Sequence, residues 1–224
     1  MATTAVDRSW NNVERIPSSP NWANPVLIAW KRAFDVFCSL LSLIILSPVF
    51  IILSVAVKFS SRGPVFYRWH VVGKSGRFFT SYKFRSMCIN ADELKSQLQA
   101  LNEMEGPVFK ITNDPRITSV GRWMRRHSLD ELPQLYSVLK GQMSLVVPRP
   151  PLQSEYLQFN DRQRQKLTVK PGITCLWQVN GRNRVKSFDE WVAMDLEYIQ
   201  SWSPLLDLKI LIRTLRAVFV GSGI

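Results

Sequence analysis

The stretch VFCSLLSLIILSPVFIILSVAV, residues 36–57, decides how the fold is interpreted because its 22 residues carry no charge. As a straight helix rising about 1.5 Å per residue, it would cross a hydrocarbon core of roughly 30 Å. Pro48 lies near its middle, directly after Ser47. A proline inside a helix removes a backbone hydrogen bond and crowds the preceding turn, so the sequence predicts a bend there.

Basic residues flank this segment on both sides: Lys31 and Arg32 before it, and Lys58 and Arg62 after it. Because cytoplasmic flanks of membrane segments carry the excess of Lys and Arg, both ends are predicted to face the cytoplasm. A helix that enters one leaflet, bends and returns accounts for the flanks and the proline together. The alternative is a buried core helix, although 22 uncharged residues exceed the length of most core helices. A signal peptide is disfavoured because the segment begins deep in the chain.

The composition narrows the class of partner. Lys plus Arg number 29 against 17 Asp plus Glu, a net charge of +12, which predicts nucleic acid, an anionic lipid surface or phosphorylated substrates. Eight Trp, twelve Phe and five Tyr exclude a disordered chain. The mean hydropathy of −0.04 excludes several membrane spans. Cys38, Cys88 and Cys175 show no metal-ligand spacing, which predicts a reducing, cytoplasm-facing environment.

These features predict an α+β, mostly helical chain in three parts. Residues 1–25 form a polar N-terminal tail, residues 26–58 a re-entrant membrane anchor helix, and residues 59–224 a cytoplasmic domain. Alternating side chains over 65–72 and 77–84, joined by Gly73-Lys74-Ser75-Gly76, predict a small β-hairpin. The predicted helices cover about 91–103, 133–139, 154–165, 188–200 and 204–220.

Two of these helices have recognisable start signals. Ser187 with Glu190 matches a capping box, and Ser203 precedes Pro204 at a first helical position. The last helix is amphipathic: its apolar residues are Leu205, Leu208, Ile212, Leu215 and Phe219, and its basic residues are Lys209, Arg213 and Arg216. It either packs on the core or lies in the lipid interface with its basic side toward headgroups.

The sequence RRHSLDELP, residues 125–133, holds the first candidate site. Two adjacent carboxylates, Asp130 and Glu131, follow two adjacent guanidiniums next to a predicted helix start. Ser128 and Glu131 also match a capping box, so a structural role is the alternative. Pro133 makes a regular helix from Ser128 awkward.

Two further runs contain candidate phosphate and sugar ligands. Prolines on both sides of Arg149, in SLVVPRPP at 144–151, restrict its backbone and suit it to bidentate phosphate binding, with an ordinary turn as the alternative. Residues 169–184 form a loop-like stretch dense in amides and cations, suitable for a nucleotide, a sugar or solvent. The chain has no Walker loop, no GxGxxG and no zinc spacing, and only His70 and His127 as histidines.

Taken in order, these motifs resemble the bacterial sugar transferases, the monotopic polyprenyl-phosphate phosphoglycosyl transferases. The resemblance covers about residues 31–218 and rests on KRAFD at 31–35, SP at 47–48, KFRSM at 83–87, SLDELPQL at 128–135, PRP at 148–150, KPGIT at 170–174 and QVNGR at 178–182. It implies a monotopic anchor in the bacterial inner membrane, with the catalytic domain facing the cytoplasm. It also implies transfer of a sugar 1-phosphate from a UDP-sugar to undecaprenyl phosphate, which initiates exopolysaccharide, capsule or O-antigen type glycan assembly.

The resemblance also assigns roles to residues. Asp130 attacks the donor diphosphate, releases UMP and carries the phosphosugar as a covalent intermediate, with Glu131 as its catalytic partner. Mg²⁺ is held by Glu131 and Asp195, although a solvated helix carboxylate is the alternative for Asp195. The substrate-binding residues are Lys83, Arg85, Arg125, Arg149, Gln178, Asn180 and Arg182. The expected partners are the UDP-sugar, the polyprenyl phosphate and anionic membrane lipids, without nucleic acid; a homo-oligomer stays open.

Three positions depart from the family pattern. They are Val147 before Pro-Arg-Pro, Gln142 where an acidic residue is usual, and Cys175 where Gly is usual. Val147 and Cys175 would cost backbone freedom if those positions need a positive φ. The alternative functions are therefore a non-catalytic membrane-associated member of the family and, from the charge alone, a membrane-tethered nucleic-acid binder.

Overall fold

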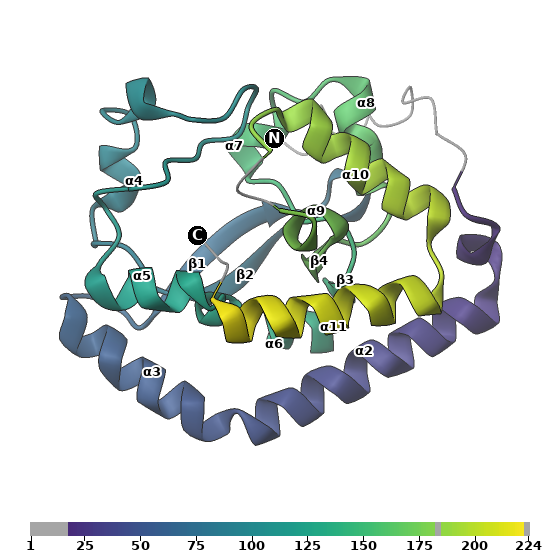
Figure 1. The fold of residues 1–224 in the computed structure, drawn as a ribbon, viewed down its shortest axis with the longest axis horizontal. Coiled ribbons are helices and arrows are strands. Elements are labelled where there is room, and N and C mark those ends of the chain that lie inside the picture. The colour runs from purple at the N-terminus through teal and green to yellow at the C-terminus, as the bar shows by residue number, and fades with distance from the viewer. Residues whose placement is uncertain (1–17, 182–184, 222–224) are drawn as a thin grey trace.

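The computed structural model describes residues 18–181 and 185–221, and its lower edge is a bent pair of helices (Figure 1). These are α2 (Pro25–Ile45) and α3 (Ser47–Ser60), which meet at 63°. Pro48 lies in the first turn of α3, where it needs no hydrogen bond, and the Ser47 hydroxyl donates to the Ile44 carbonyl at 2.8 Å. The predicted bend is confirmed. Within the described residues no single helix is long and apolar enough to cross a membrane, whereas the bent pair meets that test of length and composition together.

The outward side of this pair is apolar. Twelve large apolar side chains there are exposed: Val26, Ile28, Trp30, Phe37, Leu40, Leu41, Ile44, Ile45, Ile51, Ile52, Val55 and Phe59. The buried residues of α2 are instead polar, namely Lys31, Asp35 and Ser39. The pair is therefore not a core helix of the usual kind, because its apolar side faces away from the protein.

Buried polar bonds fix α2 to the rest of the chain. Lys31 Nζ lies 2.5 Å from Asp207 Oδ2 and also donates to the Val146 carbonyl. The Asp35 carboxylate accepts from the Ser144 hydroxyl at 2.7 Å and from the Leu145 amide. By contrast, α3 contacts the body through apolar residues in a small second core formed by Leu53, Val57, Phe84 and Met124.

The predicted hairpin forms from β1 (Phe66–Val72) and β2 (Phe78–Phe84), paired antiparallel with Trp69 opposite Ser81. The turn η2 (Lys74–Gly76) places Ser75 at φ 55°. A second, parallel pair, β3 (Ser144–Val146) with β4 (Gly172–Thr174), was not predicted. Together with the helices, these pairs give a mostly helical α+β fold.

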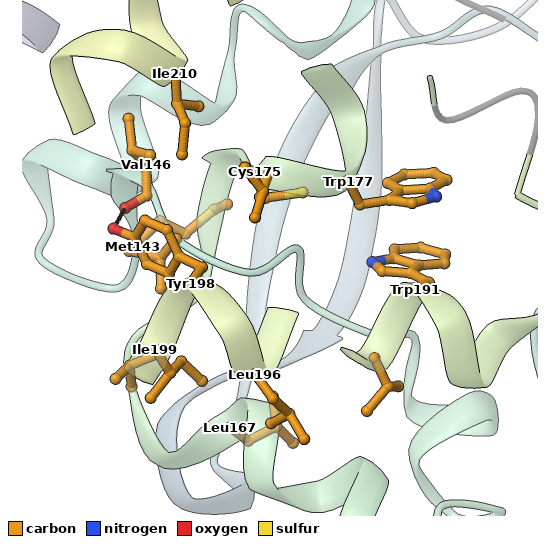
Figure 2. Close-up of a cluster of buried hydrophobic side chains, with 14 of the residues drawn as sticks. Met143, Val146, Leu167, Cys175, Trp177, Trp191, Leu196, Tyr198, Ile199 and Ile210 are labelled. Carbon is orange, nitrogen blue, oxygen red and sulfur yellow. Dashed lines mark hydrogen bonds between the residues drawn. The ribbon is translucent and has the colours of Figure 1, made fainter. Parts of the chain in front are cut away.

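The main core lies between β3, β4 and the helix α10 (Phe188–Ser201). Figure 2 shows the Trp177 and Trp191 rings lying face to face, with centroids 3.9 Å apart, and the Tyr198 hydroxyl donating to the Val146 carbonyl. The remaining elements are η1 (Pro20–Ala23), α4 (Ala91–Leu94), η3 (Gln99–Leu101), α5 (Ser119–Arg126), η4 (Leu129–Glu131), α6 (Gln134–Leu139), α7 (Gln153–Tyr156), α8 (Asp161–Arg164), η5 (Gln165–Thr168), α9 (Leu176–Val179) and α11 (Pro204–Val220).

Two predicted helices are wrong in extent. The segment 91–103 keeps only α4 and η3, because Ala91 is the one buried residue of these two elements and a longer helix would have no apolar face to bury. The segment 154–165 is split into α7 and α8. Asn160 and Gln163 form a reciprocal capping box, which starts a new helix.

The predicted helices at 133–139, 188–200 and 204–220 are confirmed within a residue. The Ser203 hydroxyl accepts from the Leu206 amide at the start of α11, as predicted, whereas the Ser187 side chain makes no capping bond and that predicted capping box is wrong. The apolar positions that defined the amphipathic face of α11 are exposed: Leu205, Leu208, Ile212, Leu215 and Phe219. This face does not pack on the core. In Figure 1, α5 and α11 lie end to end in a row above α2 and α3, and the His127 ring at the end of α5 bonds to the Val218 carbonyl near the end of α11.

The last part of the predicted tail is packed against the body. The Ser19 amide donates to the Ile199 carbonyl, and the Trp22 and Trp202 rings stack at 4.2 Å. Residues 1–17 lie outside the described residues.

Candidate active site

The two adjacent carboxylates sit in η4, a single turn between α5 and α6. Ser128 enters this turn at φ 53°, ψ 22°, a left-handed conformation that reverses the chain after α5. Asp130 and Glu131 are 7% and 8% exposed. Pro133 is no obstacle, because η4 ends before it and α6 begins after it.

The capping interpretation of this motif is wrong. The Ser128 side chain makes no capping hydrogen bond, and the Glu131 side chain accepts from two cations on other elements. A capping box needs a Ser in extended backbone whose hydroxyl accepts from the third residue of the helix. The carboxylates therefore have some role other than starting a helix.

Two cations converge on Glu131 from separate parts of the fold. Lys83 Nζ, at the end of β2, lies 3.0 Å from Glu131 Oε1, and Arg149 Nη1 lies 2.7 Å from the same oxygen. The prolines beside Arg149 hold its backbone just after β3. Both cations also lie over the Trp69 ring, Lys83 Nζ at 3.7 Å and Arg149 Cζ at 5.0 Å from its centroid. Trp69 was predicted only as a strand residue.

Asp130 differs from Glu131 in its partners. Its carboxylate makes no hydrogen bond or ion pair with any described residue. Burial and the neighbouring Glu131 raise the pKa of Asp130 above its usual range, while Lys83, Arg125 and Arg149 act in the opposite direction. An unengaged carboxylate beside three cations can approach a phosphorus atom whose charged oxygens those cations neutralise.

The Lys83 ammonium is also perturbed. Burial and the guanidinium of Arg149 lower its pKa to about 8, against the opposing effect of Glu131 and Asp130. Its charge is therefore sensitive to pH near neutrality, unlike that of an ordinary lysine.

A glycine brings Arg125 to the site. Arg125 Nε donates to the Ser86 hydroxyl at 2.8 Å, which directs the guanidinium along the cavity wall. One turn earlier, a Cβ built on Gly121 would lie 1.9 Å from the Ser86 carbonyl oxygen. Only a residue without a side chain lets α5 approach the end of β2 so closely.

These residues line a cavity of about 690 Å³. It is lined by the hairpin, by η4, by segments 85–95, 104–117 and 149–155, and by Trp177 and Trp191. Its volume lies within the ordinary range for small-molecule sites. The aromatic part of this lining was not predicted from the sequence and is made by Trp69, Phe109, Trp177 and Trp191. Among these, only Trp69 carried a usable signal, since strand alternation placed it two residues from Val71 on one face.

Comparison with known proteins identifies the family. The family model described as bacterial sugar transferase matches residues 26–221. The chain belongs to the bacterial sugar transferase family.

The chain is also similar to individual bacterial enzymes. It is 45% identical to galactosyl transferase CpsE of Streptococcus agalactiae over 86% of this chain and 43% of that protein. It is 45% identical to undecaprenyl-phosphate galactose phosphotransferase of Salmonella typhimurium, over 86% and 41%. It is 40% identical to exopolysaccharide production protein ExoY of Sinorhizobium fredii, over 93% of both. The chain thus spans about two fifths of the first two relatives and nearly all of the third.

In this bacterial sugar transferase, the other predicted ligands lie elsewhere or are engaged. Arg85 lines the cavity, but its terminal nitrogens donate to the carbonyls of Val57, Ser61 and Arg62, which ties the end of α3 to β2. Asn180 accepts from Arg213 of α11 at 3.1 Å. Gln178 does not line the cavity. Arg182 lies outside the described residues.

Asp195 is buried beneath the aromatic wall. Its Oδ2 lies 2.6 Å from Lys166 Nζ, and both side chains are almost fully buried. Lys166 Nζ also lies 4.8 Å from the ring centroid of Trp191, so this buried ion pair packs against one of the aromatic residues that line the cavity. Asp195 does not line the cavity, and the structure does not bring it together with Glu131.

Asp130 and Glu131 are too few to hold Mg²⁺ through protein ligands alone. Among the described residues no group of three or more His, Cys, Asp or Glu is arranged to hold a metal. Mg²⁺ nevertheless commonly binds through one or two carboxylates and completes its shell with water and substrate phosphate. Asp130 and Glu131 meet that requirement.

The departures from the family pattern cause no backbone strain. Within the described chain, neither Val147 nor Cys175 has a positive φ, and Cys175 is extended at −151°. The Val147 amide donates to the Thr174 carbonyl, continuing the β3–β4 pairing. The close approach of the two strands depends on Gly172, where a Cβ would lie 2.3 Å from the Val147 carbonyl oxygen.

Proposed function

We propose that this chain transfers a sugar 1-phosphate from a UDP-sugar to a polyprenyl phosphate, with Asp130 as nucleophile. The observation that carries the proposal is the Asp130 carboxylate, buried at a cavity wall with no partner of its own beside the cations Lys83, Arg125 and Arg149. An ionised carboxylate is a nucleophile without a general base, and the cations Lys83, Arg125 and Arg149 favour the ionised form of Asp130 against the effect of its burial. The name of the Salmonella typhimurium relative, an undecaprenyl-phosphate galactose phosphotransferase, supports the same chemistry.

The reaction has two displacements at one phosphorus. In the first, an Asp130 oxygen bonds to the phosphorus that carries the sugar, the bond from that phosphorus to the bridging oxygen breaks, and UMP leaves with that oxygen. In the second, an oxygen of the polyprenyl phosphate bonds to the same phosphorus and the Asp130 oxygen leaves. The products are a polyprenyl diphosphate sugar and the regenerated carboxylate.

The cations have complementary tasks in this scheme. Lys83 and Arg149 lie on either side of Glu131 and would neutralise oxygens of the donor diphosphate. Arg125, positioned by Ser86, would meet the phosphate from the α5 side. Mg²⁺, held by Glu131 with Asp130 beside it, would supply further positive charge to the leaving UMP.

The polyprenyl phosphate acceptor is a lipid, so the active site must be reached from a membrane surface. We propose that α2 and α3 dip into the cytoplasmic leaflet of the bacterial inner membrane, with the apolar side of α11 in the interface. The exposed apolar side chains of these three helices, and the row of α5 and α11 above α2 and α3 in Figure 1, support this orientation. A polyprenyl phosphate in that leaflet would reach the cavity from below.

The test is mass spectrometry of the chain incubated with each of a panel of UDP-sugars and Mg²⁺, without lipid acceptor. The expected result is a mass increase of one sugar phosphate with the correct donor, mapped to Asp130 and absent in Asp130→Asn. Asp92→Asn is the matched control, because Asp92 is another carboxylate on the same cavity wall. An adduct mapped to another residue, or UMP release by Asp130→Asn at the parent's rate once polyprenyl phosphate is added, would refute the proposed mechanism.

A further inference from the structure

A second cavity, of about 440 Å³, lies beside the first turns of α2 and is separate in its lining from the active site. Four cations line it against a single carboxylate: Lys31, Arg32, Lys74 and Lys170 against Asp35. The cations come from three places, namely α2, the hairpin turn η2 and the residue that follows Val169 after η5. Since η2 packs against η5, the fold itself gathers these charges.

Three of the five charges are already engaged. Lys31 pairs with Asp207, and the Asp35 carboxylate accepts from Ser144 and Leu145. Arg32 donates to the carbonyls of Val138 and Leu139 at the C-terminus of α6 at 2.6 and 2.8 Å, which satisfies groups that a helix end leaves open.

Lys74 and Lys170 remain. Across residues 18–181 and 185–221, neither makes an ion pair, and both are exposed. Lys170 reaches toward Arg32: a Cβ built on Gly141 would lie 3.6 Å from Arg32 Nη2 and 4.0 Å from Lys170 Nζ. Burial and repulsion from Arg32 and Lys74 lower the pKa of Lys170, with Asp35 opposing them. The repulsion between like charges held this close decreases when an anion binds between them.

We infer that this cavity binds the phosphate of an anionic lipid headgroup, with Lys74 and Lys170 as its principal ligands. The choice of a lipid over a soluble phosphate rests on Ile28, which lines the same cavity and is 43% exposed. It belongs to the apolar outward side of α2, along which an acyl chain would lie. The inference rests on the membrane orientation proposed above but not on the transfer reaction.

The experiment is a lipid titration of the full chain in an uncharged detergent, with bound lipid counted by native mass spectrometry. Phosphatidylglycerol is compared with phosphatidylcholine of the same acyl chains, and with soluble glycerol phosphate as competitor. Lys74→Gln with Lys170→Gln should weaken phosphatidylglycerol binding about thirtyfold, from about fivefold per lysine. Lys74→Arg with Lys170→Arg should bind like the parent.

The matched control is Arg162→Gln with Lys186→Gln, which removes the same charge from exposed residues that do not line the cavity. Equal binding by all variants, or equal loss in both charge-removing pairs, would overturn the inference. Displacement of the lipid by glycerol phosphate at similar concentration would keep the anion site and overturn the lipid as its source. Because no sugar donor is present, a failure of the transfer reaction leaves this result unaffected.

Discussion

Asp130 and Glu131 are neighbours in the chain, yet their carboxylates have different surroundings. Glu131 is held between Lys83 and Arg149, whereas Asp130 has no partner among the described residues. Their variants should therefore fail differently. Asp130→Asn should form no phosphosugar adduct, because a neutral amide replaces the nucleophile. Glu131→Gln keeps the nucleophile and should form the adduct slowly, with a rate that rises with added Mg²⁺. Adduct mass measured against time distinguishes them, and identical kinetics in the two variants would contradict the separate roles.

Lys83 predicts an alkaline limit to activity. With its pKa lowered to about 8, the ammonium is charged below that pH and loses its charge as the pH rises through it. The kcat/KM of UMP release should therefore fall above about pH 8, since the free enzyme loses a cation that neutralises phosphate. The raised pKa of Asp130 predicts a fall on the acid side, where the nucleophile becomes protonated. In Lys83→Arg the alkaline limb should move to higher pH, because a guanidinium stays charged there. A limb that does not move in this variant would assign it to another group.

At the scale of elements, the contact between α5 and the end of β2 controls the position of Arg125. Gly121→Ala places a methyl group against the Ser86 carbonyl, so α5 must shift. The expected loss of unfolding free energy is about 1–3 kcal/mol, and activity should fall further than stability because Arg125 leaves Ser86. Arg122→Ala, on the exposed side of the same helix, is the control and should change neither. Thermal unfolding and UMP release measure the two effects. A Gly121→Ala variant with the stability and activity of the parent would show that α5 can shift without loss of either.

The elements that local pattern predicted are those whose signal is itself local. Strand alternation identified the hairpin, helical spacing and Ser203 identified α11, and Pro48 located the bend. The pair β3–β4 escaped prediction because three-residue strands show no periodicity and form only by pairing across 28 residues of sequence. Helix α5 escaped because its apolar contacts are few, with Gly121 and Met124 as its buried residues.

The same distinction applies to the candidate site. Asp130, Glu131 and Arg149 were candidates from their own sequence patterns and Lys83 from the resemblance, and the structure brings these four together. Arg85 and Asn180 belong to the same motifs but bond to other elements, which no motif records. The Trp177 and Trp191 wall depends on tertiary packing, since the two rings come from α9 and α10. The charged residues of the candidate site were therefore easier to predict from the sequence than the aromatic residues that shape its cavity.

At the scale of the whole molecule, Asp207 joins the bent helix pair to the body. It accepts from Lys31, Tyr198 and Trp202, all buried. Asp207→Asn should leave the Lys31 charge unpaired and cost about 3–5 kcal/mol of unfolding free energy. Adding Lys31→Met should recover part of that loss, because no uncompensated charge remains. Thermal unfolding in detergent measures both, and a double variant no more stable than Asp207→Asn alone would contradict the coupling.

Topology is tested at the same scale. Single cysteines at Asn24 and Ser61, just outside α2 and α3 and introduced after Cys38, Cys88 and Cys175 are replaced by Ser, should both react with a membrane-impermeant label only from the cytoplasmic side. Ser47→Leu with Pro48→Ala restores the helix hydrogen bond and should move Ser61 toward the opposite side. The chain without added cysteines is the control. Labels on opposite sides in the parent would show a spanning helix.

The polar inward side of α2 also sets the order in which the protein can mature. Lys31 and Asp35 are synthesised early, yet their partners Ser144, Val146 and Asp207 are made 109, 115 and 176 residues later. A ribosome therefore releases α2 long before the groups that pair with Lys31 and Asp35 exist, and a buried unpaired charge is costly. In the proposed membrane orientation, α2 must therefore keep Lys31 at the aqueous surface until Asp207 has left the ribosome. The final placement of α2 then follows the folding of the body and does not precede it.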